Sequence, residues 1–142
     1  MGAGKAIYAE NVMVGCALCA KWADLAEGYE SDSVYEPGTL VKFGGEKEIT
    51  IADDESNAVI TTNPGLVLGA SEQVSVKQNI ALVGRVPVKV VGNVKKFDKL
   101  VLSEIPGVAR AKTAQDTKPT IGRALQTVEV ENNQITLVES VV

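Results

Sequence analysis

Short runs in which hydrophobic and polar residues alternate fill most of the chain from residue 36 onwards. A period of two is that of a β-strand with one buried face. The runs at 39–43 and 47–52 flank Gly44-Gly45, which predicts a β-hairpin closed at the two glycines. Asn132-Asn133 predicts a second tight turn, of type I′. Further strands are expected at 58–62, near 100–102, near 121–130 and at 135–142, with a polar surface loop at 110–120.

The densest strand signal lies at 73–83 and 85–91, on either side of Gly84. Val86, Val88 and Val90 fall on one face of the second run, so we expect them to be buried together. Pro87 has no N–H to donate. We therefore expect this strand to pair on one side only at that point, or to lie at an edge.

The first part of the chain has a different pattern. Residues 7–14 predict a strand or an extended arm. Residues 17–27 are rich in Ala and Leu, their apolar positions recur at three- and four-residue steps, and Gly28 follows them. These features predict one short helix. We therefore divide the chain into an N-terminal arm at 1–21 and a single β-rich domain at 22–142.

Composition supports a β fold for the 142 residues. Val (21) and Ile (eight) together far outnumber Leu (ten), and side chains branched at Cβ favour strands. Only six aromatic residues are present, so aliphatic side chains must fill the core. The predicted fold class is mainly β: a small sandwich or barrel of short strands, with one short helix near the N-terminus and an extended N-terminal arm.

The residue inventory excludes several kinds of chemistry. The chain has no His and two Cys, which excludes imidazole-based catalysis and any tetracysteine or His-containing zinc site within one chain. No apolar run approaches the roughly 20 residues that cross a bilayer. The net charge is −4, so a nucleic-acid partner is not expected either.

The charge is distributed unevenly along the chain. Residues 1–71 hold four basic and 11 acidic residues, a net charge of −7, whereas 72–142 hold ten basic and seven acidic residues, a net charge of +3. Opposite charges of this kind suit complementary surfaces that meet between copies. The alternative is that the two halves of one domain neutralise each other.

Four groups of residues were considered as sites. Cys16 and Cys19 have dithiol spacing, but nothing else predicts the βαβ fold that a thioredoxin-like site requires. The role of this pair stays open between a redox dithiol, a disulfide that links chains and two small residues beside a helix. Asp53, Asp54 and Glu55 could attract calcium, although adjacent carboxylates on a loop are usually only solvated.

The other two groups are a possible nucleophile and an acidic segment. Ser103 and Lys99 could form a nucleophile pair, but only their proximity in sequence suggests it. The acids at 24, 27, 30 and 32 could serve an interface or a self-cleavage apparatus, or lie on a solvated helix flank. We assign no catalytic, cofactor-binding or metal-binding residue and expect no enzymatic turnover.

Six segments carry a resemblance to a known family. They are residues 22–29 (Trp-Ala-Asp-Leu-Ala-Glu-Gly-Tyr), 36–45 (Glu-Pro-Gly-Thr-Leu-Val-Lys-Phe-Gly-Gly), 62–64 (Thr-Asn-Pro), 84–90 (Gly-Arg-Val-Pro-Val-Lys-Val) and 94–107, followed by Ile-Gly-Arg-Ala-Leu at 121–125. In this order they resemble the C-terminal domain family of bacteriophage tail-fibre and appendage proteins, which is related to self-cleaving intramolecular-chaperone domains. Phe97 stands where the family has Gly.

The resemblance implies a virion structural protein. We expect a symmetric β-domain, a homotrimer, that acts as a capsid decoration, collar or tail-fibre component and uses no cofactor. Its expected partners are copies of itself and other virion proteins, the latter through the N-terminal arm. The alternative is a self-processing chaperone domain for fibre trimerisation. Only 21 residues precede Trp22, so we expect no fibre to be released.

Overall fold

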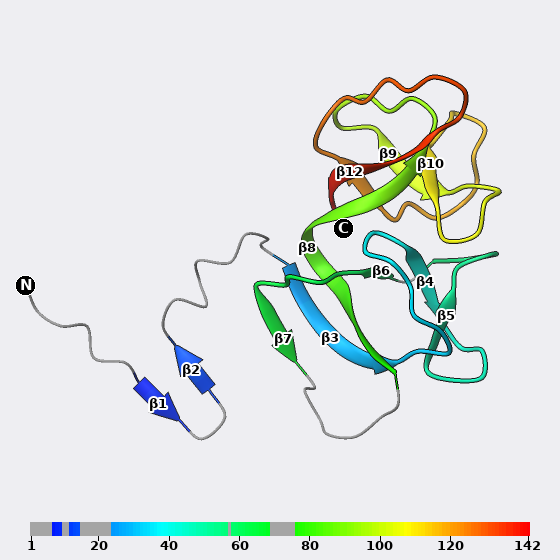
Figure 1. Ribbon diagram of the computed structural model, residues 1–142. Helices are drawn as coiled ribbons and strands as arrows, with labels where there is room; N and C mark the ends of the chain where they lie inside the picture. The colour runs from blue at the N-terminus through cyan, green and yellow to red at the C-terminus, as the bar shows by residue number, and fades with distance from the viewer. Residues whose placement is uncertain (1–6, 10–11, 15–23, 57, 69–75) are drawn as a thin grey trace, which may run out of the picture.

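The computed structural model describes residues 7–9, 12–14, 24–56, 58–68 and 76–142, and all of their regular structure is β (Figure 1). The first six strands are β1 (Ile7–Ala9), β2 (Val12–Val14), β3 (Asp24–Glu30), β4 (Leu40–Phe43), β5 (Ile49–Ile51) and β6 (Ala58–Ile60). The others are β7 (Leu66–Leu68), β8 (Lys77–Val91), β9 (Lys99–Leu102), β10 (Ala109–Ala111), β11 (Gly122–Ala124) and β12 (Ile135–Val141).

Five strands close a barrel in the C-terminal half of the chain. β8 pairs with β12 over seven residue pairs, β12 pairs with β11, β11 with β9, and β9 with β10. The parallel pair Ala109–Val90 returns β10 to β8 and completes the ring. The sequence left a sandwich and a barrel as alternatives, and this part of the chain forms a closed barrel.

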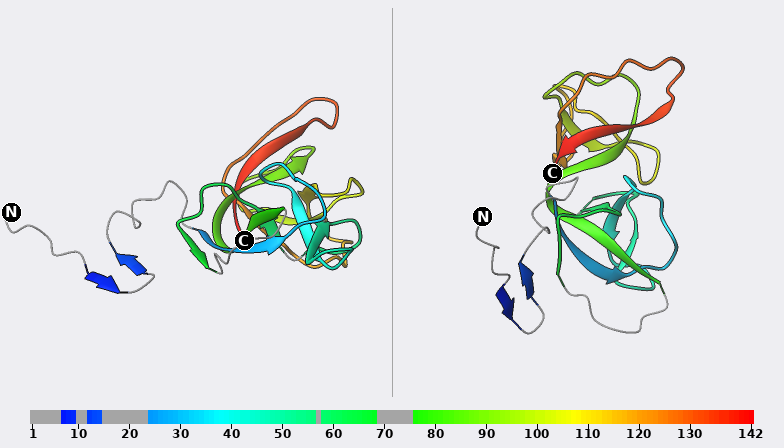
Figure 2. Two further views of the ribbon diagram at one scale, coloured as in Figure 1. Left: turned by 60° about the horizontal axis from the view of Figure 1, so that its bottom comes forward. Right: turned by 60° about the vertical axis from the view of Figure 1, so that its left-hand side comes forward.

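The first half of β8 belongs to a second ring of strands. β3 pairs with one side of β8 and β6 with the other, while β4 joins β6 to β5. β5 then returns to the end of β3, where the Glu48 N–H donates to the Glu30 carbonyl at 3.1 Å. Figures 1 and 2 show β8 running from this lower group of strands into the barrel above it.

Two clusters of buried aliphatic side chains fill the rings, and one of them spans the junction. The second ring encloses a small cluster with Tyr29 and Tyr35 at its edge: Val41, Ile49, Ala58, Ile60 and Ile80. The larger cluster fills the barrel and continues onto the second ring: Leu40, Ala52, Val59, Ala81, Val86, Val88, Val90, Val94, Leu100, Leu102, Ala109, Ala124 and Val138. Burial of this apolar surface is the main force that holds the two rings together.

Backbone hydrogen bonds reinforce the junction at Gly107. Its N–H donates to the Ala52 carbonyl at 2.7 Å, and its carbonyl accepts the Leu40 N–H at 2.8 Å. Gly107 has φ 75°, and a Cβ placed there would lie 2.8 Å from the Thr39 Cγ2. Only glycine accommodates both the left-handed conformation and this close approach.

The predicted turns are confirmed. Val41 pairs with Ile51 across the hairpin, and Gly44-Gly45 makes the turn with φ values of 122° and 88°. Asn132 and Asn133 have φ values of 55° and 53°, the left-handed pair that a type I′ turn requires.

The interpretation of the valine-rich strand is also confirmed. Val86, Val88 and Val90 are fully buried on one face of β8. Pro87 lies opposite Glu139 of β12, and among the described strands no other pairs with β8 at that residue. The missing N–H is therefore tolerated on the unpaired side.

The predicted helix at 17–27 is wrong where the structure describes it. Asp24–Glu27 begin β3, which pairs antiparallel with β8 and buries Ala26 between Ala81 and Val67. These tertiary contacts outweigh the helix propensity of the Ala- and Leu-rich segment. Residues 17–23 lie outside the described part of the chain.

Two other predicted strands are shorter than expected. Residues 7–14 were predicted to form a strand or an extended arm, and they contain two three-residue strands, β1 and β2, which pair antiparallel with Ile7 opposite Val14. In the segment 121–130, β11 ends at Ala124, and only the bridge from Val128 to Val94 continues the sheet.

Phe97 adopts the conformation that glycine would favour. Its φ is 75°, and its N–H donates to the Ala124 carbonyl at 2.8 Å. The Lys96 Nζ lies 5.1 Å from the centre of the Phe97 ring. The turn thus keeps a left-handed residue at this position although the side chain is an exposed aromatic one.

Candidate interaction surface

β7 has an unusual surface for a strand. Leu66, Val67 and Leu68 are all exposed, by 55%, 37% and 45% respectively. The strand pairs in parallel with β3 and with no other described strand. A fully apolar strand with one open edge is a surface to which another chain can add. No strand was predicted at this position, although a short apolar run such as Leu-Val-Leu directly after the Pro64-Gly65 turn is a signal for one.

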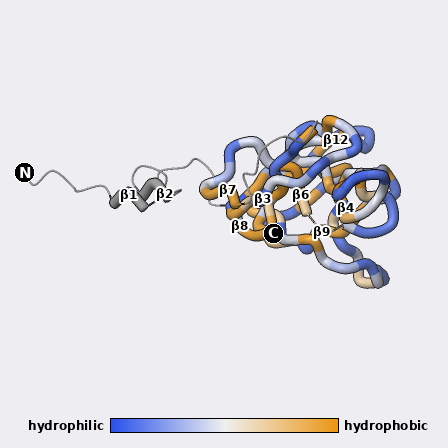
Figure 3. Tube along the Cα trace, turned by 90° about the horizontal axis from the view of Figure 1, so that it is seen from below, coloured by the Kyte–Doolittle hydropathy of each residue, from blue (hydrophilic) through white to orange (hydrophobic). Residues whose placement is uncertain are grey.

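The apolar surface continues from β7 across β3 to β8. Leu66 lies opposite Leu25, and Leu25 lies opposite Val83, so the three positions form one row across the sheet. A β-bulge between Leu25 and Ala26 adds Leu82 to the exposed residues of β8. Figure 3 shows the hydrophobic segments of β7, β3 and β8 beside one another. We call Leu66, Val67, Leu68, Leu82 and Val83 the β7 patch.

A second exposed apolar row lies on the outside of the barrel. Ile135, Leu137 and Val141 of β12 are each more than 40% exposed and alternate with positions that face the barrel interior. The row is interrupted by Glu139, whose carboxylate lies 3.4 Å from the Arg85 guanidinium. The opposite charges on this face keep it from being wholly apolar.

An open groove of about 710 Å³ adjoins the β12 row. The Glu36–Lys89 ion pair, at 2.7 Å, lies at the groove. This ion pair joins the acidic half of the chain to its basic half. The Lys89 ammonium holds the pKa of Glu36 below its ordinary value. Apart from Thr136, the rest of the lining is apolar: Pro37, Ile105, Pro106, Val108, Ile135 and Leu137.

The acids that the sequence grouped at 24–32 do not form one site. The Glu27 carboxylate accepts the Tyr29 hydroxyl at 2.7 Å, which raises the pKa of Tyr29. Glu30 pairs with Lys47 at 2.8 Å. Burial acts to raise the pKa of Asp32, but hydrogen bonds, that from the Tyr35 hydroxyl first, hold it below its ordinary value. These three carboxylates therefore have separate partners.

Asp24 differs from the other three acids. Its side chain is buried, and Oδ1 accepts the Gly65 N–H at 3.2 Å while Oδ2 has no hydrogen-bond partner. The Gly65 N–H also donates to the Asp24 carbonyl at 3.0 Å. These contacts fasten the turn before β7 to the start of β3.

The acidic loop after β5 is held by a lysine. The Lys42 Nζ lies 2.6 Å from Asp53 and 2.6 Å from Asp54, and these hydrogen bonds raise the pKa of the ammonium. The Asp54 Oδ1 also accepts the Glu55 N–H at 2.8 Å. Within the described ranges, no group of three or more His, Cys, Asp or Glu is arranged to hold a metal ion.

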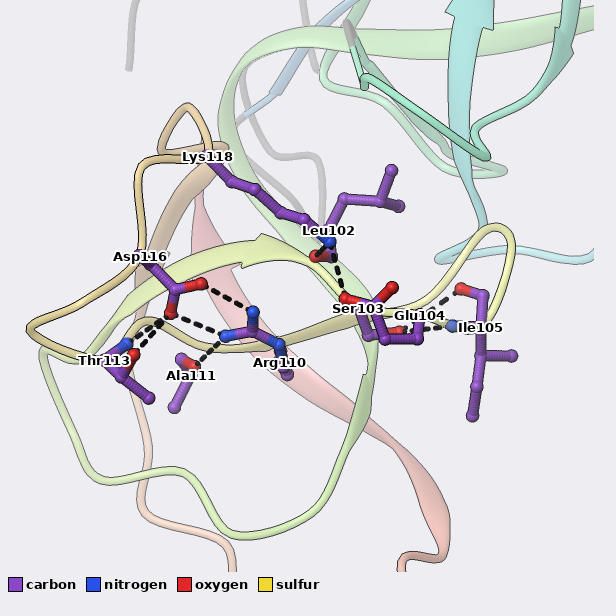
Figure 4. Close-up of polar contacts among 9 residues, drawn as sticks. All are labelled: Leu102, Ser103, Glu104, Ile105, Arg110, Ala111, Thr113, Asp116 and Lys118. Carbon is purple, nitrogen blue, oxygen red and sulfur yellow. Dashed lines mark hydrogen bonds and ion pairs between the residues drawn. The ribbon is translucent and has the colours of Figure 1, made fainter.

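Ser103 has a structural position in the loop after β9. Its hydroxyl donates to the Ile105 carbonyl at 3.2 Å and accepts the Ile105 N–H at 3.1 Å (Figure 4). Ser103 is buried, and these two hydrogen bonds within the local turn satisfy its hydroxyl. Lys99 opens β9 opposite Arg123, and no contact with Ser103 supports a nucleophile pair.

The polar loop predicted at 110–120 begins only after β10, which ends at Ala111, and one arginine–aspartate pair fastens it. The Arg110 guanidinium binds both oxygens of Asp116, at 2.7 and 2.6 Å, and Asp116 also accepts the Thr113 N–H at 2.6 Å (Figure 4). Arg110 is the main reason why the pKa of Asp116 lies well below its ordinary value. Because these groups satisfy one another, the cluster anchors the loop and presents no free reactive group.

The structure does not test the candidate dithiol, because Cys16 and Cys19 lie outside the described residues.

The comparisons with known proteins show a similar fold in part of one solved protein. No protein-family model and no curated protein sequence matches the chain. A crystal structure of the pre-mature bacteriophage phi29 gene product 12 matches with a TM-score of 0.64 and 16% sequence identity. The match covers 86% of this chain and 22% of that one, so the chain spans about a fifth of the phage protein's length. The architecture described above is therefore one that also occurs in part of a bacteriophage protein.

Proposed function

We propose that the chain is a structural component of a bacteriophage particle that works by associating with copies of itself. Two findings support the proposal: the fold shared with part of phi29 gene product 12, and the exposed apolar strands of the β7 patch. The exposed apolar strands carry the proposal of self-association, because they are a physical property of this chain. We propose a symmetric homotrimer within a capsid decoration, collar or tail-fibre appendage.

The energetics of the exposed strands support self-association. Each large aliphatic side chain that moves from water into a packed interface contributes roughly 1 kcal/mol or more. The β7 patch and the β12 row together present eight such side chains on one chain of 142 residues. Contiguous apolar patches of this kind mark interaction sites. Since all copies are identical, a closed symmetric oligomer covers every patch at once.

Light scattering of the intact chain over a hundredfold range of concentration tests the proposal. We expect a molar mass that rises to a fixed multiple of 14.9 kDa, with three as the multiple. A mass of 14.9 kDa at every concentration would contradict self-association. A fixed multiple other than three would reject the trimer and keep the rest of the proposal.

A second candidate function is self-processing as a chaperone domain for fibre trimerisation. The observation that favours it is the likeness to a protein solved in its pre-mature form. Intact-mass spectrometry separates the two functions. A structural component keeps its full mass during storage, whereas a self-processing domain, which hydrolyses one of its own peptide bonds, yields two fragments whose masses add up to that of the chain plus one water molecule.

A further inference from the structure

We propose that the β1–β2 hairpin of one copy adds to the open edge of β7 in a second copy. The inference rests on the proposed self-association and names the contact that carries it. It follows from two elements of the same chain: a hairpin that needs a further strand or a packing surface, and a strand edge that needs a partner strand.

The hairpin is the first incomplete element. Its strands have three residues each, and they form a separate two-stranded sheet that pairs with no other described strand. An isolated two-stranded hairpin is marginal in water at best and needs a third strand or a packing surface. The six strand residues are Ile, Tyr, Ala, Val, Met and Val, so none carries a charge that would keep the hairpin in solvent.

The edge of β7 is the second incomplete element. β3 occupies one side of β7, and no described strand occupies the other. Figure 1 shows β7 at the outer margin of the lower ring. Natural proteins protect such edges with charged residues or proline, but β7 is Leu-Val-Leu. Its backbone groups and its side chains both favour an added strand.

The two elements match in length and polarity. β1, β2 and β7 each have three residues, so one hairpin strand can pair along the whole of β7. Main-chain hydrogen bonds would hold the added strand, and the exposed side chains of the β7 patch would cover its apolar residues. The ten-stranded sheet system of one chain would then gain the hairpin as two further strands.

A second copy is the better donor of the hairpin. Among the described residues of one chain, the hairpin pairs only with itself, and no strand occupies the open edge of β7. Reciprocal exchange between copies satisfies every hairpin and every edge in a closed ring. Docking of the hairpin onto β7 of its own chain is the competing outcome, and the experiment below separates the two.

Disulfide trapping in the full-length chain tests the contact. Cys16 and Cys19 are first replaced by Ser, and Val67→Cys is then combined with either Tyr8→Cys or Met13→Cys, the central residues of the three strands. Paired residues on neighbouring strands have Cα atoms about 4.5 to 5.5 Å apart, within the range that a disulfide spans. The matched control replaces Val67→Cys with Phe97→Cys, because Phe97 is exposed by 61% on a turn of the barrel.

We expect bridges from residue 8 or 13 to residue 67 between chains, seen as covalent oligomers on a non-reducing gel and identified by peptide mass spectrometry. Mixing a chain that carries only the hairpin cysteine with one that carries only Val67→Cys should give the mixed dimer. Bridges that form only within monomers, or as often to residue 97 as to residue 67, would overturn the proposal. So would the absence of bridges in a chain that light scattering shows to be assembled.

A charge variant provides a test that does not depend on cysteine chemistry. Leu66→Lys with Leu68→Lys places two like charges on the open edge and should weaken self-association at least tenfold, whereas Phe97→Lys should leave it unchanged. Far-UV circular dichroism checks that both variants keep the β fold. If the native chain assembles and the β7 variant assembles equally well, the hairpin contact is wrong although the proposed function stands. A native chain that stays monomeric at all concentrations would contradict both the hairpin contact and the proposed self-association.

Discussion

The shared strand β8 makes a specific prediction about Val88. Its side chain is fully buried in the barrel cluster, and β8 continues from the barrel into the second ring. Because one strand belongs to both rings and one buried cluster spans their junction, we expect the rings to unfold together. Val88→Ala should therefore destabilise the whole molecule, including the ring that does not contain residue 88.

The magnitude follows from the atoms removed. Val88→Ala deletes two carbons, worth roughly 0.8 kcal/mol each by transfer from water. The cavity left behind adds to this loss, because a packed barrel relaxes only in part. We expect a decrease of about 2 to 3 kcal/mol in the free energy of unfolding. Val91→Ala is the matched control on the outer side of the same strand, where Val91 is half-buried, and should lose about 1 kcal/mol or less.

Urea unfolding followed by two signals checks the prediction. Far-UV circular dichroism reports all strands, and near-UV circular dichroism has contributions from Tyr29 and Tyr35 at the edge of the second ring. We expect both midpoints to fall together in Val88→Ala. A near-UV midpoint that stays at the native value while the far-UV transition splits in two would refute the coupling, and equal losses for Val88→Ala and Val91→Ala would refute the barrel core.

Three further predictions concern single residues. Gly107→Ala should lower the free energy of unfolding by about 2 kcal/mol or more in urea titrations, because its positive φ and the approach to Thr39 both oppose a Cβ, and a loss below about 0.5 kcal/mol would contradict the junction. Phe97→Gly should keep or raise the melting temperature, since it removes the left-handed strain of roughly 1 kcal/mol, and a clear fall would show that the ring contact with Lys96 matters more. The pKa of Asp116 is lower in the folded chain than in the unfolded one, so its bond to Arg110 stabilises the fold above the unfolded pKa of about 4, and this stabilisation is lost as the pH falls towards the folded pKa. The difference in melting temperature between the native chain and Asp116→Asn should therefore be full at pH 7 and shrink below about pH 4. A difference that does not vary with pH would contradict this assignment.

The sequence predicted the elements whose pattern is local. Glycine pairs and asparagine pairs fix the turns at 44–45 and 132–133 because few other residues adopt a positive φ. The one-sided burial of β8 followed from the alternation of Val86, Val88 and Val90. Pro87 then indicated the side on which a partner strand is missing.

The elements that depend on distant partners were not predictable in the same way. Ala26 favours a helix in isolation, and it lies in a strand because Ala81 and Val67 flank it. β7 was missed because three consecutive apolar residues show no alternation, and their exposure appears only once the sheet is assembled. The apolar surface likewise brings together Leu25, Leu66 and Val83, which are far apart in the sequence, so no short stretch of the chain reveals it.

Hydrogen exchange at two concentrations is the most direct test of the central idea, that other copies of the chain cover its exposed apolar strands. The amides of residues 7–14 and 66–68 should exchange more slowly in concentrated solution than in dilute solution, while those of the barrel core should exchange equally in both. Exchange at 66–68 that is fast and the same at both concentrations would show that the edge of β7 remains open to water, and it would contradict the account.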